Sequence, residues 1–165
     1  MKKRLVLLLL LCMMGCSGRG LTEADLSEII LQSWDLRGPY GIQRGSVALP
    51  ARLQGLPGFQ VAAFHPILNV VNPSGGVGVF LYEDEVARES AYLLMTDSMP
   101  RGTEAFNLAG EKGMIWHDSL IGETELVYVK CRAVVYIQVT GTADPSAVID
   151  YGVGLDAGLK KAVCR

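Results

Sequence analysis

Four cysteines have the most distinctive chemistry in this 165-residue sequence. Cys12 and Cys16 lie four residues apart in LLLCMMGCSG, behind a run of leucines, whereas Cys131 and Cys164 lie near the C-terminus. Cysteine thiols can pair as disulfides, bind metal ions or carry a lipid. A metal site at Cys12 and Cys16 is disfavoured, because zinc takes three or four ligands and no histidine is nearby.

The first 15 residues have the pattern of a secretory signal peptide. Lys2, Lys3 and Arg4 give a basic start, and residues 5–14 are ten apolar residues. A membrane-spanning helix needs about 20 apolar residues, so this run is too short to span. A basic start, a short apolar core and small residues at its end predict a signal peptide over residues 1–15. An ordinary cleaved signal and a retained anchor stay as alternatives to lipid attachment.

The segment Met13-Met14-Gly15-Cys16 resembles the bacterial lipobox, in which Gly, Ala or Ser precedes an invariant Cys. Methionines stand where Leu and a small residue are usual. The resemblance implies cleavage before Cys16, a diacylglycerol thioether on its thiol, and an acyl chain such as palmitate on its new amine. Two or more chains anchor a protein stably, since each buried CH₂ contributes about 0.8 kcal/mol. Cys12 is then part of a discarded leader, and residues 16–21 form a tether at the extracytoplasmic face of the cell membrane or outer membrane.

The charge of the processed chain argues against nucleic acid as a partner. The whole chain has 15 basic and 17 acidic residues, and removing the three basic residues of the leader leaves 12 against 17, a net charge of −5. Nucleic-acid binding needs concentrated Lys and Arg. The membrane contact is therefore expected to come from the lipid on Cys16.

Cys131 and Cys164 are the two thiols that remain after processing. An oxidising compartment favours a disulfide between such a pair. The bond would close a loop of about 34 residues and contribute on the order of 4 kcal/mol in the chain-entropy model. Two free, buried thiols are the alternative.

The two histidines, His65 and His117, give little support for a catalytic or metal centre. No H-x-x-x-H spacing exists, so we predict no metal site. His117 and Asp118 are weak catalytic candidates, because they could join Ser74 or Ser119 in a hydrolase triad. No G-x-S-x-G motif supports that triad.

Two further motifs have simpler structural interpretations. GVGLDAG, residues 152–158, has one residue too many for a dinucleotide-binding loop and falls inside a predicted helix. The acids of YEDE, residues 82–85, are consecutive, whereas calcium loops need alternate acids. We therefore expect no cofactor.

The elements that position these residues alternate between helices and pairs of strands. Thr22 is a plausible N-cap for a helix that ends near Arg37. Residues 38–45 are expected to be loop, and residues 47–53 and 58–64 to be strands. NPSGG at 72–76 predicts a turn before a strand at 77–82. Further elements are a helix from Glu83 with the inner stripe Val86, Ser90 and Leu93 or Leu94, and a strand at 114–116.

Residues 125–140 predict a β-hairpin that turns at residues 130–133. On its second strand, Val135, Ile137 and Val139 share one face, and the other face is more polar. The last helix starts at Asp144-Pro145, and its apolar stripe is Val148, Tyr151, Leu155 and Leu159. Strand–strand runs favour an α+β fold, an antiparallel sheet packed by two or three helices, as a single domain over residues 22–165.

LTEADLSEIILQSWDLRGPYG, with the C-terminal hairpin and closing helix, resembles small envelope lipoproteins of unassigned function. It is remotely similar to extracytoplasmic sensor domains of some actinobacterial kinases, which carry more cysteines. We predict a lipid-anchored envelope protein that is not an enzyme, because the sequence shows no complete set of catalytic residues. It would bind a partner protein or an apolar small ligand through one sheet face. The alternative is an envelope hydrolase of cell-wall or lipid substrates that uses His117 and Asp118.

Overall fold

A computed structural model describes residues 20–34, 40–44, 49–69, 72–141 and 145–164. Within these ranges, seven antiparallel strands form one sheet in the order β1-β2-β3-β7-β6-β5-β4. The strands are β1 Tyr40–Ile42, β2 Val61–Asn69, β3 Asn72–Leu81, β4 Glu104–Ala105, β5 Lys112–Asp118, β6 Glu123–Lys130 and β7 Ala133–Thr140. The helices are α2 Glu23–Gln32, α3 Ala51–Gln54, α4 Glu85–Asp97 and α5 Ser146–Val163.

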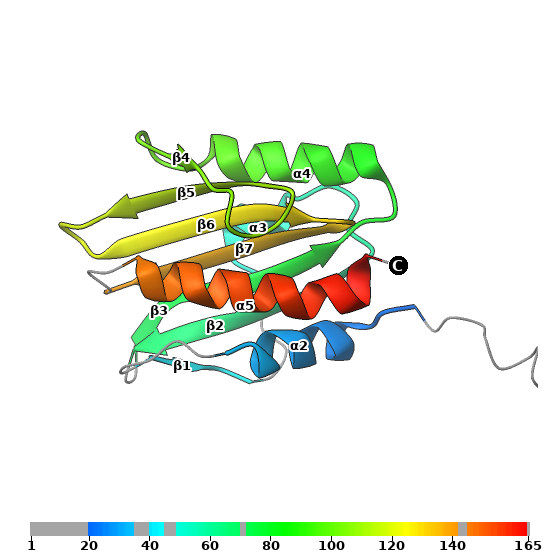
Figure 1. The fold of residues 1–165 in the computed structure, drawn as a ribbon, viewed down its shortest axis with the longest axis horizontal. Coiled ribbons are helices and arrows are strands. Elements are labelled where there is room, and N and C mark those ends of the chain that lie inside the picture. Colours follow the sequence, from blue (N-terminus) through cyan, green and yellow to red (C-terminus); the bar gives the residue numbers. More distant parts are fainter. Residues whose placement is uncertain (1–19, 35–39, 45–48, 70–71, 142–144, 165) are drawn as a thin grey trace, which may run out of the picture.

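Helices cover both faces of the sheet (Figure 1). One hydrophobic cluster joins α2 and α5 to one face, and a second joins α3 and α4 to the other. The α+β class and the antiparallel sheet are confirmed, although four described helices pack on the sheet instead of two or three. None of the described helices is both long and apolar enough to cross a membrane.

Side chains of β7 alternate between the two clusters, as the sequence predicts for a strand. Val135, Ile137 and Val139 face α2 and α5. Val134 and Tyr136 point to the opposite face, which was expected to be the more polar one, and they are buried beneath α3 and α4. The central strands are therefore enclosed on both faces.

Helix α2 begins at the predicted cap. The Asp25 N–H donates to Thr22 Oγ1 at 3.3 Å, and the Thr22 N–H donates to Asp25 Oδ2 at 2.8 Å, which together form a capping box. The helix ends at Gln32, before the predicted end near Arg37. Residues 35–39 lie outside the described residues.

Three predictions between residues 40 and 76 are wrong. Residues 40–42 form a strand instead of a loop, residues 51–53 lie in helix α3 instead of a strand, and residues 72–76 belong to β3 instead of a turn. Within β3, Gly75 can pair closely with β7 because glycine has no side chain to collide with the neighbouring strand. A Cβ on Gly75 would lie 1.9 Å from the Gln138 carbonyl oxygen of β7. A bulge in β2 at residues 66–68 then shifts the register.

The predicted inner stripe of α4 is also wrong. Val86 is 72% exposed, and Leu93 and Leu94 are 49% and 53% exposed. The buried residues are Ala91, Tyr92 and Met95. The helix has two apolar stripes, and the sheet buries the one that contains Tyr92, the aromatic residue of this helix.

Helix α5 buries the predicted stripe of Val148, Tyr151, Leu155 and Leu159. Its N-cap is Pro145, and Asp144 lies outside the described residues. Residues 152–158 lie within the helix, where Gly152 meets the sheet. A Cβ on Gly152 would lie 2.7 Å from Leu126 Cδ2, so glycine permits this close packing.

The predicted disulfide joins Cys131 to Cys164, with 5.3 Å between their Cα atoms. It connects the two-residue turn between β6 and β7 to the end of α5. Cys131 has a φ of 49°, which is unusual for a residue other than glycine. Its N–H donates to Glu111 Oε1 at 2.9 Å, and Arg88 Nη1 donates to its carbonyl oxygen. These contacts and the disulfide hold the turn.

Candidate functional site

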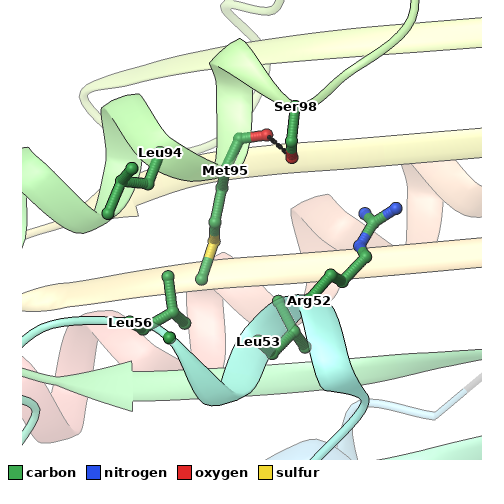
Figure 2. A pocket seen from close by; sticks show the side chains of 7 residues that line it. Arg52, Leu53, Leu56, Leu94, Met95 and Ser98 are labelled. Atoms are coloured by element: carbon green, nitrogen blue, oxygen red, sulfur yellow. Dashed lines mark hydrogen bonds between the residues drawn. The ribbon is translucent and has the colours of Figure 1, made fainter.

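A pocket of about 190 Å³ lies between α3 and α4, over the sheet. Its lining residues are Arg52, Leu53, Gly55, Leu56, Leu94, Met95 and Ser98. Figure 2 shows the Met95 side chain reaching from α4 toward α3. Leu56 and Leu94 lie toward one end, and Arg52 and Ser98 lie toward the other. The pocket therefore has an apolar end and a polar end.

Local hydrogen bonds at the start of α3 and at the end of α4 position the two walls of the pocket. Pro50 fixes the backbone before α3, and its carbonyl accepts from the Leu53 N–H at 2.8 Å. On the other wall, Ser98 Oγ donates to the Met95 carbonyl oxygen at 2.7 Å, where α4 ends. Leu53 and Met95 are buried, whereas Leu94 is half exposed at the mouth.

Arg52 connects the pocket to a buried carboxylate. Its Nη2 donates to Glu125 Oε1 of β6, and its Cζ lies 4.7 Å from the centroid of the Tyr136 ring. The Arg52 side chain is 37% exposed, whereas that of Glu125 is 2% exposed. The cation therefore lies partly in solvent, and its anionic partner lies inside the protein.

A short polar network continues from this ion pair along the sheet. Tyr136 Oη donates to Gln138 Oε1 at 2.6 Å, and Gln138 Nε2 donates to Glu123. Glu125 is directly opposite Gln138 on β7 and Trp116 on β5. Because side chains two residues apart on a strand share a face, Glu123 and Glu125 both lie on the α3–α4 side.

Burial raises the pKa of the Glu125 carboxyl above its usual value. The charge of Arg52 and its hydrogen bond act in the opposite direction, and the nearby charge of Glu123 raises this pKa further. Burial also raises the pKa of the Tyr136 hydroxyl, and the Glu125 charge adds to that effect. Tyr136 is therefore a neutral hydrogen-bond donor at physiological pH.

His117 and Asp118 make separate local contacts. His117 Nδ1 lies 2.9 Å from Thr124 Oγ1, and Thr124 is buried. Asp118 Oδ1 accepts from the Leu120 N–H at 2.8 Å in the turn after β5. Adjacent residues on a strand point to opposite faces, so the two side chains diverge.

The serine candidates for a triad are not brought to His117. Ser74 is buried in β3, next to Gly75. The row Gly75–Val139–Thr124–His117 crosses from β3 to β5, and three strand spacings amount to about 14 Å. Ser119 lies in an exposed turn. The described contacts therefore assemble no triad from these residues.

His65 is buried in β2, and its Nδ1 lies 2.9 Å from the Gln43 carbonyl oxygen. The imidazole therefore donates from Nδ1 to this carbonyl. Among the residues that the structure describes, no cluster of His, Cys, Asp and Glu could hold a metal ion.

Sequence reasoning missed Arg52 and Glu125. One signal for Glu125 was available, because the alternation of β6 puts it on the same face as Val127 and Val129, which are both buried. An acid at a core position indicates a buried partner. No comparable signal marks Arg52, because α3 was predicted to be a strand.

Comparison with known proteins gives no match. No family model matches the chain, and no curated protein sequence or solved structure matches it. Inferences about function therefore rest on the pocket, the ion pair and the N-terminal sequence.

Proposed function

We propose that this protein is a lipid-anchored component of the bacterial cell envelope that binds a small apolar ligand and is not an enzyme. The pocket between α3 and α4 is its binding site. The observation that carries the proposal is the division of this pocket into an apolar end and a polar end around Arg52. Ligand sites are typically concave and mostly apolar, with a few polar groups that orient the ligand.

The N-terminal sequence supports the location. Residues 1–19 lie outside the described residues, so the lipid on Cys16 is proposed from the resemblance of Met13–Cys16 to a lipobox. The contacts of His117 with Thr124 and of Asp118 with its own turn favour a binding protein over the hydrolase alternative.

Binding can be followed at a methionine that lines the pocket. We would label the methionine methyl groups with ¹³C in the full chain, reconstituted in phospholipid nanodiscs, and titrate hexan-1-ol by NMR. Empty nanodiscs give the blank. The Met95 resonance should shift in a saturable manner, because its side chain lies between the two walls.

Leu93 and Leu94 provide a matched pair of variants. Both are about half exposed, but only Leu94 lines this pocket. Leu94→Trp should fill the mouth and weaken hexanol binding about tenfold or more, whereas Leu93→Trp should change it less than about twofold. Equal effects of the two substitutions, or no Met95 shift in the parent protein, would contradict the proposal.

A further inference from the structure

We infer that the ligand of the α3–α4 pocket is a short apolar carboxylate that takes Arg52 from Glu125, with uptake of a proton by Glu125. This inference rests on the proposed function, since it assigns the chemistry of the ligand in the same pocket. It adds the identity of the ligand's polar group and couples binding to protonation.

The size of the pocket sets the size of the ligand. Its volume of about 190 Å³ is below the ~300–1,000 Å³ typical of sites for drug-sized ligands. The walls at the end away from Arg52 are leucine and methionine side chains. This space suits a short aliphatic chain better than a long acyl chain or a nucleotide.

Arg52 selects the charge of the ligand. Among the described residues that line the pocket, it is the one that carries a charge. A guanidinium has five N–H donors in a planar fork. Among the described residues, Glu125 accepts a hydrogen bond from Arg52 Nη2. The side chain is 37% exposed, so donors remain for a ligand. Carboxylates bind such a fork with charge-assisted and often bidentate hydrogen bonds.

Glu125 supplies the proton-dependent part of the exchange. Among the described residues, the charges that act on it are Arg52 from α3 and Glu123 on its own strand. The Glu125 charge acts in turn on Tyr136 of β7, and its strand neighbours Trp116 and Gln138 are uncharged. A second carboxylate at Arg52 repels the first and competes for the same donors. Glu125 is buried, so it takes a proton from solvent when Arg52 turns toward the ligand.

The inference is tested with two ligands that differ in charge. Hexanoate and hexanamide are titrated at pH 6 into the full chain in nanodiscs, with Met95 as the NMR reporter. We expect hexanoate to bind about tenfold or more tightly than hexanamide, as one charge-assisted hydrogen bond predicts. Calorimetry in two buffers of different ionisation enthalpy should show proton uptake with hexanoate and none with hexanamide.

Two variants separate the roles of the ion pair. Glu125→Gln leaves the Arg52 charge in place, so the preference for hexanoate should stay or increase, and proton uptake should vanish. Arg52→Gln combined with Glu125→Gln removes both charges without leaving a buried acid unpaired. This double variant should bind the two ligands within about twofold of each other.

The outcomes distinguish this inference from the proposed function. If hexanamide binds as tightly as hexanoate in the parent protein, the carboxylate assignment is wrong and the apolar site remains. If hexanoate, hexanamide and hexan-1-ol all leave Met95 unchanged, both proposals are wrong. An acetylated dipeptide that ends in leucine identifies the source: tighter binding than hexanoate indicates a peptide C-terminus, and weaker binding indicates a free acid.

Discussion

Glu125 is a buried carboxylate on a strand face that it shares with the apolar side chains of Val127 and Val129. Removing an ionised carboxylate from water costs several kcal/mol, and a partner in good geometry repays part of that cost. Arg52 provides that partner from the neighbouring helix, and Tyr136 lies beneath the guanidinium. Such a pair contributes little net stability, which is consistent with a role in binding.

The pH dependence of stability should report the raised pKa of Glu125. The folded state binds this proton more readily than the unfolded state. The contribution of Glu125 to stability is therefore largest below the unfolded pKa of about 4.3, and it is lost as pH rises through the raised folded pKa. The free energy of unfolding of the parent protein should thus fall between pH 4 and pH 7 relative to that of Glu125→Gln.

Urea unfolding at several pH values measures this difference. Glu104→Gln, at an exposed glutamate of β4, is the control for the loss of a carboxylate. A parent protein that gains stability relative to Glu125→Gln as the pH rises would show that the Arg52 charge outweighs burial.

At the scale of elements, the position of a glycine on α5 determines its effect on how this helix packs against the sheet. Gly152 faces Leu126 of β6, whereas Gly154 is exposed two residues later. The same residue type thus has opposite roles on one helix. At Gly152 it permits contact, and at Gly154 it lowers helix propensity without a packing reason.

We predict that Gly154→Ala stabilises the fold by about 0.5–1 kcal/mol, because alanine is the better helix former and the nearest atom to its Cβ would be 4.0 Å away. Gly152→Ala should destabilise it by about 1 kcal/mol, since overpacking costs about 1–3 kcal/mol and helix propensity offsets part of this. Urea denaturation of both variants gives the two signs. Stabilisation by both would show that Leu126 moves aside freely.

The disulfide is a second link between elements, because it ties the β6–β7 turn to the end of α5. Replacing Cys131 and Cys164 by serine should lower the free energy of unfolding by about 2–4 kcal/mol. Alkylation of the membrane-bound protein without reductant should leave Cys131 and Cys164 unmodified, which intact mass would show. Two alkylated cysteines would contradict the bond.

At the scale of the whole molecule, the chain enters α2 at the end of the sheet where α5 also finishes (Figure 1). The turn between β5 and β6 lies at the opposite end and carries Leu120, which is 94% exposed. In a molecule anchored through Cys16, this turn would lie at the end of the sheet away from the start of α2.

Substitution of the two leader cysteines tests the anchor. Cys16→Ser should abolish labelling by a clickable palmitate analogue and shift the protein from the membrane fraction to the soluble fraction. Cys12→Ser should retain both properties, because Cys12 is expected in the discarded leader. Acyl labelling that persists in Cys16→Ser would contradict the lipid assignment.

The sequence alone determined features that depend on local spacing. The α5 stripe, the β6–β7 hairpin and the Thr22 cap follow from periodicity and capping within a few residues. The Cys131–Cys164 pair followed from counting thiols in an expected oxidising compartment. Helices and strand pairs in this order also predicted the α+β class.

Only the tertiary structure decided which apolar stripe of α4 is buried and which residues meet at the pocket. Val86, Leu93 and Leu94 have the spacing of a core stripe, but Tyr92 and Met95 are the side chains that are buried against the sheet. Arg52 and Glu125 are 73 residues apart and meet because α3 folds back over β6. Local propensity cannot encode such a contact, because its energy arises only when the sheet, the helix and the excluded solvent are all in place.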